Sequence, residues 1–208
     1  MKLFTKTTHD HFWIILLLAS LTLSLGSAPS SAATPKIGES YGGGDVFYLD
    51  ASGQHGLIAA PADITTTFIT QTTSQFVWST DQIKYEKSSD FAYRELANTS
   101  TATSQGAANT SKILLTYPAS NFPQSAAAVA SEYRGGGYHD WFLPSRDELN
   151  LLFLSKNVIG GFVDATYWSS SEINESSAWC QSFKSESKAD DTLNFKDEYN
   201  RVRAVRAF

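Results

Sequence analysis

The sequence predicts an α+β domain with small antiparallel sheets, two helices and long polar loops. Short apolar runs bounded by glycine and other turn residues occur on both sides of the chain's middle, and they favour strands. Two segments between those runs carry helix start or stop signals. The stretches that remain are rich in Ser, Thr, Asn and Gln, which is typical of loops. Strands grouped apart from helices indicate the α+β class.

The N-terminus predicts export. Lys2 and Lys6 precede an uncharged apolar run at 12–25, and small residues follow it. This order is typical of a secretory signal peptide, with Ser31 and Ala33, or Ser30 and Ala32, at its cleavage site. A retained anchor is the alternative, but a membrane span needs about 20 apolar residues and this run is shorter. We expect residues 1–33 to be a signal peptide and residues 34–208 to be one exported domain, secreted, at the cell surface or periplasmic.

Charge and cysteine content narrow the classes of function. Removing Lys2, Lys6 and Asp10 with the signal changes the net charge from −5 to −6. An acidic chain is a poor nucleic-acid binder, because such binding depends on neutralising phosphates. Cys180 is the only cysteine, so no disulfide within the chain can form, and its apolar neighbours favour a buried thiol. A reactive or intermolecular thiol is the alternative.

A β-hairpin is expected near the start of the domain. Residues 46–49 and 55–60 read as strands around the turn Asp50-Ala-Ser-Gly53, and Gly42 to Gly44 allow a tight turn before them. Residues 64–124 are polar. They suggest one strand ending near Trp78, a loop at 99–111, and surface excursions tethered at Trp78 and Tyr85.

Two helices are expected next. Residues 125–133 are alanine-rich and precede Arg134-Gly-Gly-Gly137, which reads as a glycine stop signal. Ser145 and Glu148 form a capping-box pattern that starts the second helix, which ends before Gly160-Gly161. The last third predicts strands at 166–169, 178–183, 192–195 and 201–208. In the last of these, Val202, Ala204 and Phe208 share one side.

Several blocks in order carry a family resemblance. They are YGGGDVFYLDASGQHGLIAAPAD, GGGYHDWFLPSRDELNLLF, GGFVDATYWSSSE, AWCQSF and RVRAVRAF, and they span Gly38 to Phe208. The chain resembles the Lcl C-terminal domain family, typified by a Legionella collagen-like adhesin. The resemblance implies a C-type-lectin-like fold, related to that of formylglycine-generating enzymes, with a small twisted antiparallel sheet and with the N- and C-terminal strands side by side. It also implies homo-oligomers, namely trimers, and binding of sulfated glycosaminoglycans.

No catalytic set accompanies these motifs. A formylglycine-generating enzyme needs two cysteines, and the spacing Ser185-x-x-Lys188 lacks the other motifs of its class. We therefore expect a non-enzymatic, adhesin-like module without a cofactor or resident metal. Its partner is expected to be an extracellular polysaccharide, including a sulfated one, or a cell-surface protein. A structural envelope-associated domain without a glycan ligand is the alternative, and an enzyme by fold analogy ranks lower.

The candidate binding residues come from the late loops 172–177 and 184–200. If the late basic side chains share one face, they would bind sulfate or carboxylate groups; a mixed, solvated surface is the alternative. Calcium at the loop oxygens of Glu172, Asn174, Glu175, Asp190 and Asp191 is a further alternative. The candidate ligand-binding residues are Lys184, Lys188, Lys196, Arg201, Glu172 and Asn174. The family-specific residues expected to serve the scaffold are Trp141, Pro144, Ser145, Glu148, Trp168, Ser169 and Trp179.

Overall fold

A computed structural model describes residues 34–68, 71–79, 99–188 and 191–208. Within this part of the chain, Thr34 to Phe208 form one folded unit. The expected signal peptide and the expected tether at Tyr85 lie outside the described residues. Among the residues that are described, no helix has the length and apolar character needed to cross a membrane.

The first sheet joins the two ends of the domain. It is antiparallel in the order β1 (Ser40–Tyr41), β2 (Gly44–Leu49), β3 (Gly56–Ala59) and β9 (Val205–Ala207). The predicted hairpin is confirmed as β2 and β3, and its turn is held by the Asp50 carboxylate, which accepts from the Ser52 amide at 3.0 Å. Because β9 pairs with β3, the C-terminal strand lies beside the N-terminal hairpin, while the first strand, β1, lies at the opposite edge of this sheet.

The second sheet supplies the late polar loops. It is antiparallel in the order β6 (Thr166–Glu172), β7 (Ser177–Ser182) and β8 (Asp191–Phe195). A small hairpin of β4 (Thr66–Phe68) and β5 (Gln71–Thr73) stands where one longer strand was expected. Beyond it, Phe76 bridges Asn200 and Val77 bridges Ser125, so the segment before Trp78 is divided between partners.

The helices are α1 (Gly106–Thr116), α2 (Ala126–Ser131), α3 (Arg146–Leu154) and α4 (Lys156–Ile159), with a 3₁₀ turn at Gly135–Gly137. Two of them were expected, and α3 starts at the predicted capping box, which is confirmed. The prediction of a loop at 99–111 is wrong, because α1 begins inside it. Its buried stripe has helical spacing but is mostly polar (Gly106, Asn109, Thr110 and Ile113), so an apolar pattern could not reveal it.

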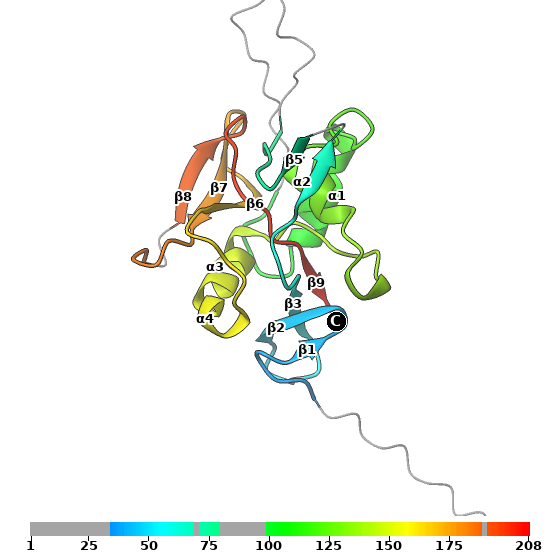
Figure 1. Cartoon of the computed structure of the whole chain (residues 1–208), viewed down its shortest axis with the longest axis vertical. Helices are drawn as coiled ribbons and strands as arrows, with labels where there is room; N and C mark the ends of the chain where they lie inside the picture. The colour runs from blue at the N-terminus through cyan, green and yellow to red at the C-terminus, as the bar shows by residue number, and fades with distance from the viewer. Residues whose placement is uncertain (1–33, 69–70, 80–98, 189–190) are drawn as a thin grey trace, which may run out of the picture. The chain divides into compact units, whose positions relative to one another are not determined.

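Helix α3 packs between the two larger sheets (Figure 1). Two buried apolar clusters flank the strands there, and successive residues point to opposite clusters. Trp168 belongs to one cluster and Tyr167 to the other, and Ala204 and Val205 divide in the same way. The shared side expected for Val202, Ala204 and Phe208 is confirmed, because all three belong to or pack against the cluster of Trp168, while Val205 belongs to the other cluster. The strand is shorter than expected, since β9 covers only Val205–Ala207.

Two glycine runs far apart in the sequence meet at their backbones. A Cβ atom built on Gly43 would lie 2.6 Å from the amide nitrogen of Gly136, and both residues have positive φ. The second run does not end α2, which closes at Glu132 with ordinary helical dihedral angles. The expected stop signal is therefore wrong, and these glycines instead allow two chain segments to approach more closely than side chains would permit.

Candidate binding site

The N-terminus of α3 is built from two sequence segments, DWFLPSRDELN at 140–150 and YWSSSE at 167–172. The Ser145 hydroxyl accepts from the Glu148 amide at 3.2 Å, and the Glu148 carboxylate accepts from the Ser145 amide at 2.8 Å. The same buried carboxylate accepts from the Gly106 amide at 3.4 Å, so one side chain serves the first turns of α1 and α3. Burial raises the pKa of Glu148, because the charged form loses its water.

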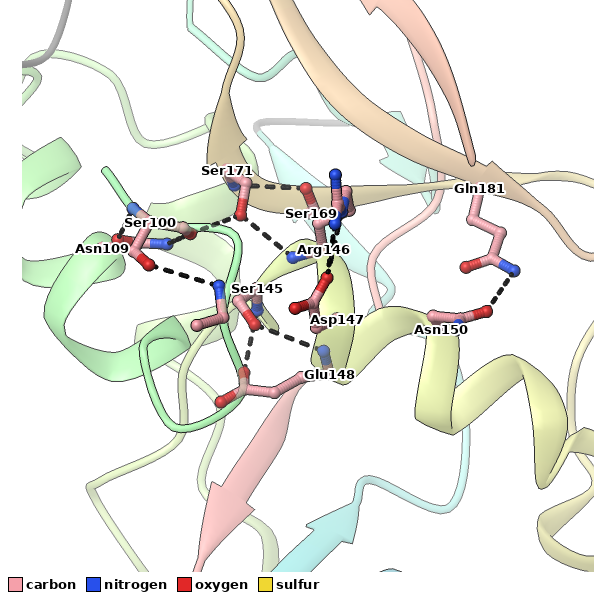
Figure 2. A network of polar contacts seen from close by, with 11 residues as sticks. Ser100, Asn109, Ser145, Arg146, Asp147, Glu148, Asn150, Ser169, Ser171 and Gln181 are labelled. Carbon is pink, nitrogen blue, oxygen red and sulfur yellow. Dashed lines mark hydrogen bonds and ion pairs between the residues drawn. The ribbon is translucent and has the colours of Figure 1, made fainter. Parts of the chain in front are cut away.

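The serine run of β6 anchors this helix start. The amide of Ser170 donates to the Pro144 carbonyl at 2.7 Å, and the Ser171 hydroxyl accepts from the Arg146 amide at 3.0 Å. The Ser169 hydroxyl donates to the Trp179 carbonyl at 2.8 Å. Figure 2 shows Ser169 and Ser171 beside the first turn of α3. These bonds set the position of α3 against β6 and β7.

A partly exposed seam follows from this placement. Arg146 and Asn150 lie one helical turn apart on α3. Arg146 contacts Trp179 of β7, and Asn150 contacts Gln181 of β7 (Figure 2). The Arg146 guanidinium lies 5.1 Å from the ring centroid of the half-buried Trp179, and it pairs with Asp147 at 2.9 Å. Asn150 Oδ1 accepts from Gln181 Nε2 at 3.4 Å. We call Arg146, Asp147, Asn150, Trp179 and Gln181 the α3–β7 seam.

One atom of the seam has no hydrogen-bond partner. Gln181 Oε1 is buried, and within the described residues nothing donates to it. Figure 2 shows Nε2 turned toward Asn150 and Oε1 turned the other way. A buried acceptor without a donor is uncommon in native proteins and calls for a physical explanation. The seam therefore combines an aromatic ring with guanidinium, carboxylate and amide groups, which can both donate and accept hydrogen bonds.

An apolar strip continues from the seam onto β8. Leu193 lies directly opposite Trp179 in the β7–β8 ladder, and Phe195 is two residues further along the same side of β8. Leu193 and Phe195 are 52% and 56% exposed. Directly opposite and diagonal neighbours on one sheet face are close enough to touch. We call Trp179, Leu193 and Phe195 the outer strip.

The four basic candidates do not form one face. Lys184 and Lys188 are exposed in the loop between β7 and β8. Lys196 is fully buried, pairs with Glu172 and lies 4.8 Å from the ring centroid of Trp78. Arg201 faces Asp63 at 3.6 Å. The expected basic binding face is therefore wrong at Lys196, because this lysine belongs to a buried ion pair and cannot reach a ligand.

The acidic and amide candidates are also engaged within the protein. The side chain of Glu172 is only 3% exposed and binds Lys196, so it does not present a free carboxylate in the loop. Asn174 is exposed, and its Oδ1 accepts from the amides of Ser176 and Ser177 at 2.9 Å each, which closes the β6–β7 turn. In the part of the chain that is described, no three His, Cys, Asp or Glu residues are grouped to hold a metal ion.

The scaffold candidates divide into two kinds. Trp141, Pro144 and Trp168 are buried, like Ser145, Glu148 and Ser169. The indole N–H of Trp168 donates to the Phe76 carbonyl at 2.8 Å, and that of Trp141 to the Gly135 carbonyl at 3.1 Å. Trp179 differs, because it is half-buried at the sheet surface. Cys180 beside it is buried, as expected from its apolar neighbours.

Sequence reasoning missed most of the seam. From the sequence, only a position on the polar side of an amphipathic helix could be assigned to Arg146, Asp147 and Asn150. Only a position in a strand could be assigned to Gln181. Leu193 and Phe195 were expected in a strand. The sequence around them does not show that their side chains remain exposed in the fold. A usable signal was present in β8, where two large apolar residues alternate with Thr192 and Asn194 at the end of a polar loop.

Comparisons with known proteins place the chain in no family. No family model matches it, and no curated protein matches it either. Among solved structures, a fimbrial protein from Bacteroides ovatus is similar, with 16% sequence identity and a TM-score of 0.46. The match covers 84% of this chain and 45% of that protein, so the chain spans less than half of its length.

Proposed function

We propose that this protein is an exported, non-enzymatic binding module with a C-type-lectin-like fold, and that its α3–β7 seam binds a neutral glycan. The observation that carries the proposal is the half-buried Trp179 bordered by guanidinium, carboxylate and amide groups. An aromatic ring offers a flat apolar surface to the C–H face of a sugar. Arg146 donates, Asp147 accepts and Asn150 does both, which matches the mixed hydrogen bonding of adjacent hydroxyls.

Charge favours a neutral ligand over a sulfated one. Lys196 and Arg201 are held by carboxylates, so of the four basic candidates only Lys184 and Lys188 are freely exposed. The expected mature charge of −6 repels a polyanion at long range. The seam itself holds one guanidinium and one carboxylate, which pair with each other. A ligand rich in hydroxyls requires no net positive site.

A glycan array followed by titration calorimetry tests this proposal. We expect the purified protein to bind neutral oligosaccharides, and we expect affinity to change little between low and moderate salt, because uncharged contacts are not screened. Trp179→Ala should weaken binding at least about tenfold, as for an aromatic anchor worth more than 1.4 kcal/mol. Asn150→Ala should weaken it by roughly 2- to 10-fold, the worth of about one hydrogen bond.

Matched controls keep the result specific. Asn157 is an exposed asparagine on α4, and Asn157→Ala should leave affinity unchanged. Melting temperatures of all variants show whether each one is folded. Binding to sulfated glycans alone with a steep salt dependence would contradict the proposal. The absence of any bound glycan would also contradict it and would favour the structural envelope-associated alternative.

A further inference from the structure

The groups around Trp179 differ between the side of α3 and the side of β8. Helix α3 packs on β6 and β7, and it brings Arg146, Asp147 and Asn150 to the seam (Figure 2). Strand β8 pairs with the other edge of β7 and sets Leu193 directly opposite Trp179. A sugar stacked on the indole therefore has a polar border on one side and an apolar border on the other.

The α3 side offers both a donor and an acceptor to a ligand. Asn150 Oδ1 accepts from Gln181 Nε2 at 3.4 Å, so the Asn150 amide presents its Nδ2 donor. Arg146 contacts Asp147 through Oδ1, which lies 3.0 Å from Nε and 2.9 Å from Nη2. Asp147 Oδ2 is left as an acceptor, on a side chain that is 40% exposed. Two neighbouring sugar hydroxyls, one accepting and one donating, match this pair of groups.

Leu193 lies close enough to Trp179 to contact the same ligand. The Lys196 amide donates to the Ser176 carbonyl at 2.9 Å, so the backbone of residue 196 faces β7. Hydrogen-bonded and non-bonded pairs alternate in an antiparallel ladder, and Trp179 with Leu193 is therefore a non-bonded pair. In such pairs the Cα atoms lie about 4.5 Å apart and the side chains stand close together. A sugar ring stacked on Trp179 thus reaches over Leu193.

Leu193 offers that sugar an apolar contact alone. Its side chain is 52% exposed, and alternation along β8 points Thr192 and Asn194 to the other face of the sheet. The residues diagonal to it on β7, Ser177 and Gln181, are 5% and 1% exposed and out of reach of a ligand. A hydroxyl over Leu193 would lose water without gaining a partner among the described side chains, whereas a methyl group there would gain from burial.

We propose that the sugar bound at the α3–β7 seam carries a methyl group that packs on Leu193, and that Leu193 determines this specificity. The inference rests on the proposed function, because it assigns the orientation of the sugar in that same site. The hydroxyl edge of the sugar faces Asp147 and Asn150, its ring stacks on Trp179, and its methyl group points to β8. Two classes of neutral sugar carry such a methyl group, namely deoxyhexoses and N-acetylhexosamines.

NMR titration with matched pairs of sugars tests the inference. Fucose differs from galactose of the same hand, and rhamnose from mannose, only in having a methyl group where the other has a hydroxymethyl group. N-acetylglucosamine and glucose differ in the acetamido group. The protein should bind the methyl-bearing member of at least one pair about fourfold more tightly or better, the worth of one buried methyl group. The preferred pair identifies the class, and saturation transfer from the protein should be strongest at the methyl protons.

Variants separate this inference from the proposed function. Leu193→Asn supplies an amide of similar size that can bond a hydroxyl, so the preference for the methyl-bearing sugar should vanish or reverse. Trp179→Ala should weaken both members of each pair alike. Leu115→Asn is the matched control, because Leu115 is 83% exposed on α1, and it should keep the preference. Melting temperatures show that each variant is folded.

The two failures are distinguishable. Equal binding of both members of every pair overturns the inference, and so does a preference that survives in Leu193→Asn; either result leaves glycan binding at the seam standing. If no sugar binds the wild-type protein at all, the proposed function fails and the inference fails with it.

Discussion

Replacing Lys196 with methionine tests the buried ion pair that joins β6 to the end of β8. Lys196 is 0% exposed and its partner Glu172 is 3% exposed, so solvent screens this pair very little. Methionine is similar in length to lysine and keeps the contact with Trp78, so the change removes mainly the charge. Removing one member of a buried pair typically costs about 3–5 kcal/mol, because the other charge stays buried.

For a domain of this size, about 1 kcal/mol corresponds to roughly 2–4 °C in melting temperature. Lys196→Met should therefore melt about 6–20 °C below wild type in scanning calorimetry. The double variant Lys196→Met with Glu172→Leu should recover most of this loss, since an apolar pair of similar volume is often as stable as the ion pair. Lys184→Met, at an exposed lysine, serves as the control. A single variant within about 2 °C of wild type, or a double variant no better than the single, would refute the reasoning.

Three further predictions concern the scaffold and the N-terminus. Trp168→Ala should lose about 3–5 kcal/mol of unfolding free energy in urea titrations, the range for a buried aromatic, and a wild-type midpoint would show that Trp168 is not core. Burial raises the pKa of Glu148, so its contribution to stability is full at low pH and lost as pH rises through the raised folded-state pKa. Wild type should therefore gain melting temperature relative to Glu148→Gln on acidification from neutrality, and a difference that shrinks instead would contradict this assignment. Mass spectrometry of the exported protein should find an N-terminus after Ala32 or Ala33, and an intact chain in the membrane fraction would contradict the signal peptide.

Sequence patterns predicted those helices and turns that are stabilised by hydrogen bonds between residues near each other in the chain. The capping box at Ser145 and Glu148 predicted α3, and the turn at Asp50 predicted the first hairpin, because hydrogen bonds between near neighbours specify both. Helix α1 was not predictable in this way. Its buried stripe includes Asn109 and Thr110, which make hydrogen bonds to Ser100 and Leu143 inside the fold. Tertiary partners rather than an apolar period stabilise that helix.

The candidate binding surface was harder to predict, because it depends on contacts between residues far apart in the sequence. Lysine is almost never fully buried unless paired, so the sequence favoured an exposed Lys196. Its partner Glu172 lies 24 residues earlier, on a different strand. The outer strip could not be predicted for the opposite reason: large apolar residues are usually buried, but these are exposed. Leu193 and Phe195 on β8 are exposed, whereas α3 packs on β6 and β7, and residue types cannot show where a covering helix stops.

The contact between the two glycine runs has a consequence for how this domain can vary. Gly43 and Gly136 lie so close that a side chain on either would collide with the backbone of the other run. Neither position can gain a methyl group alone, and changing both would add the two collisions together. Insertions in either turn would separate the segments and expose the edge of Trp141, whose indole donates to Gly135. Related sequences that keep this contact should therefore keep both glycines, and libraries that randomise Gly43 or Gly136 should return glycine.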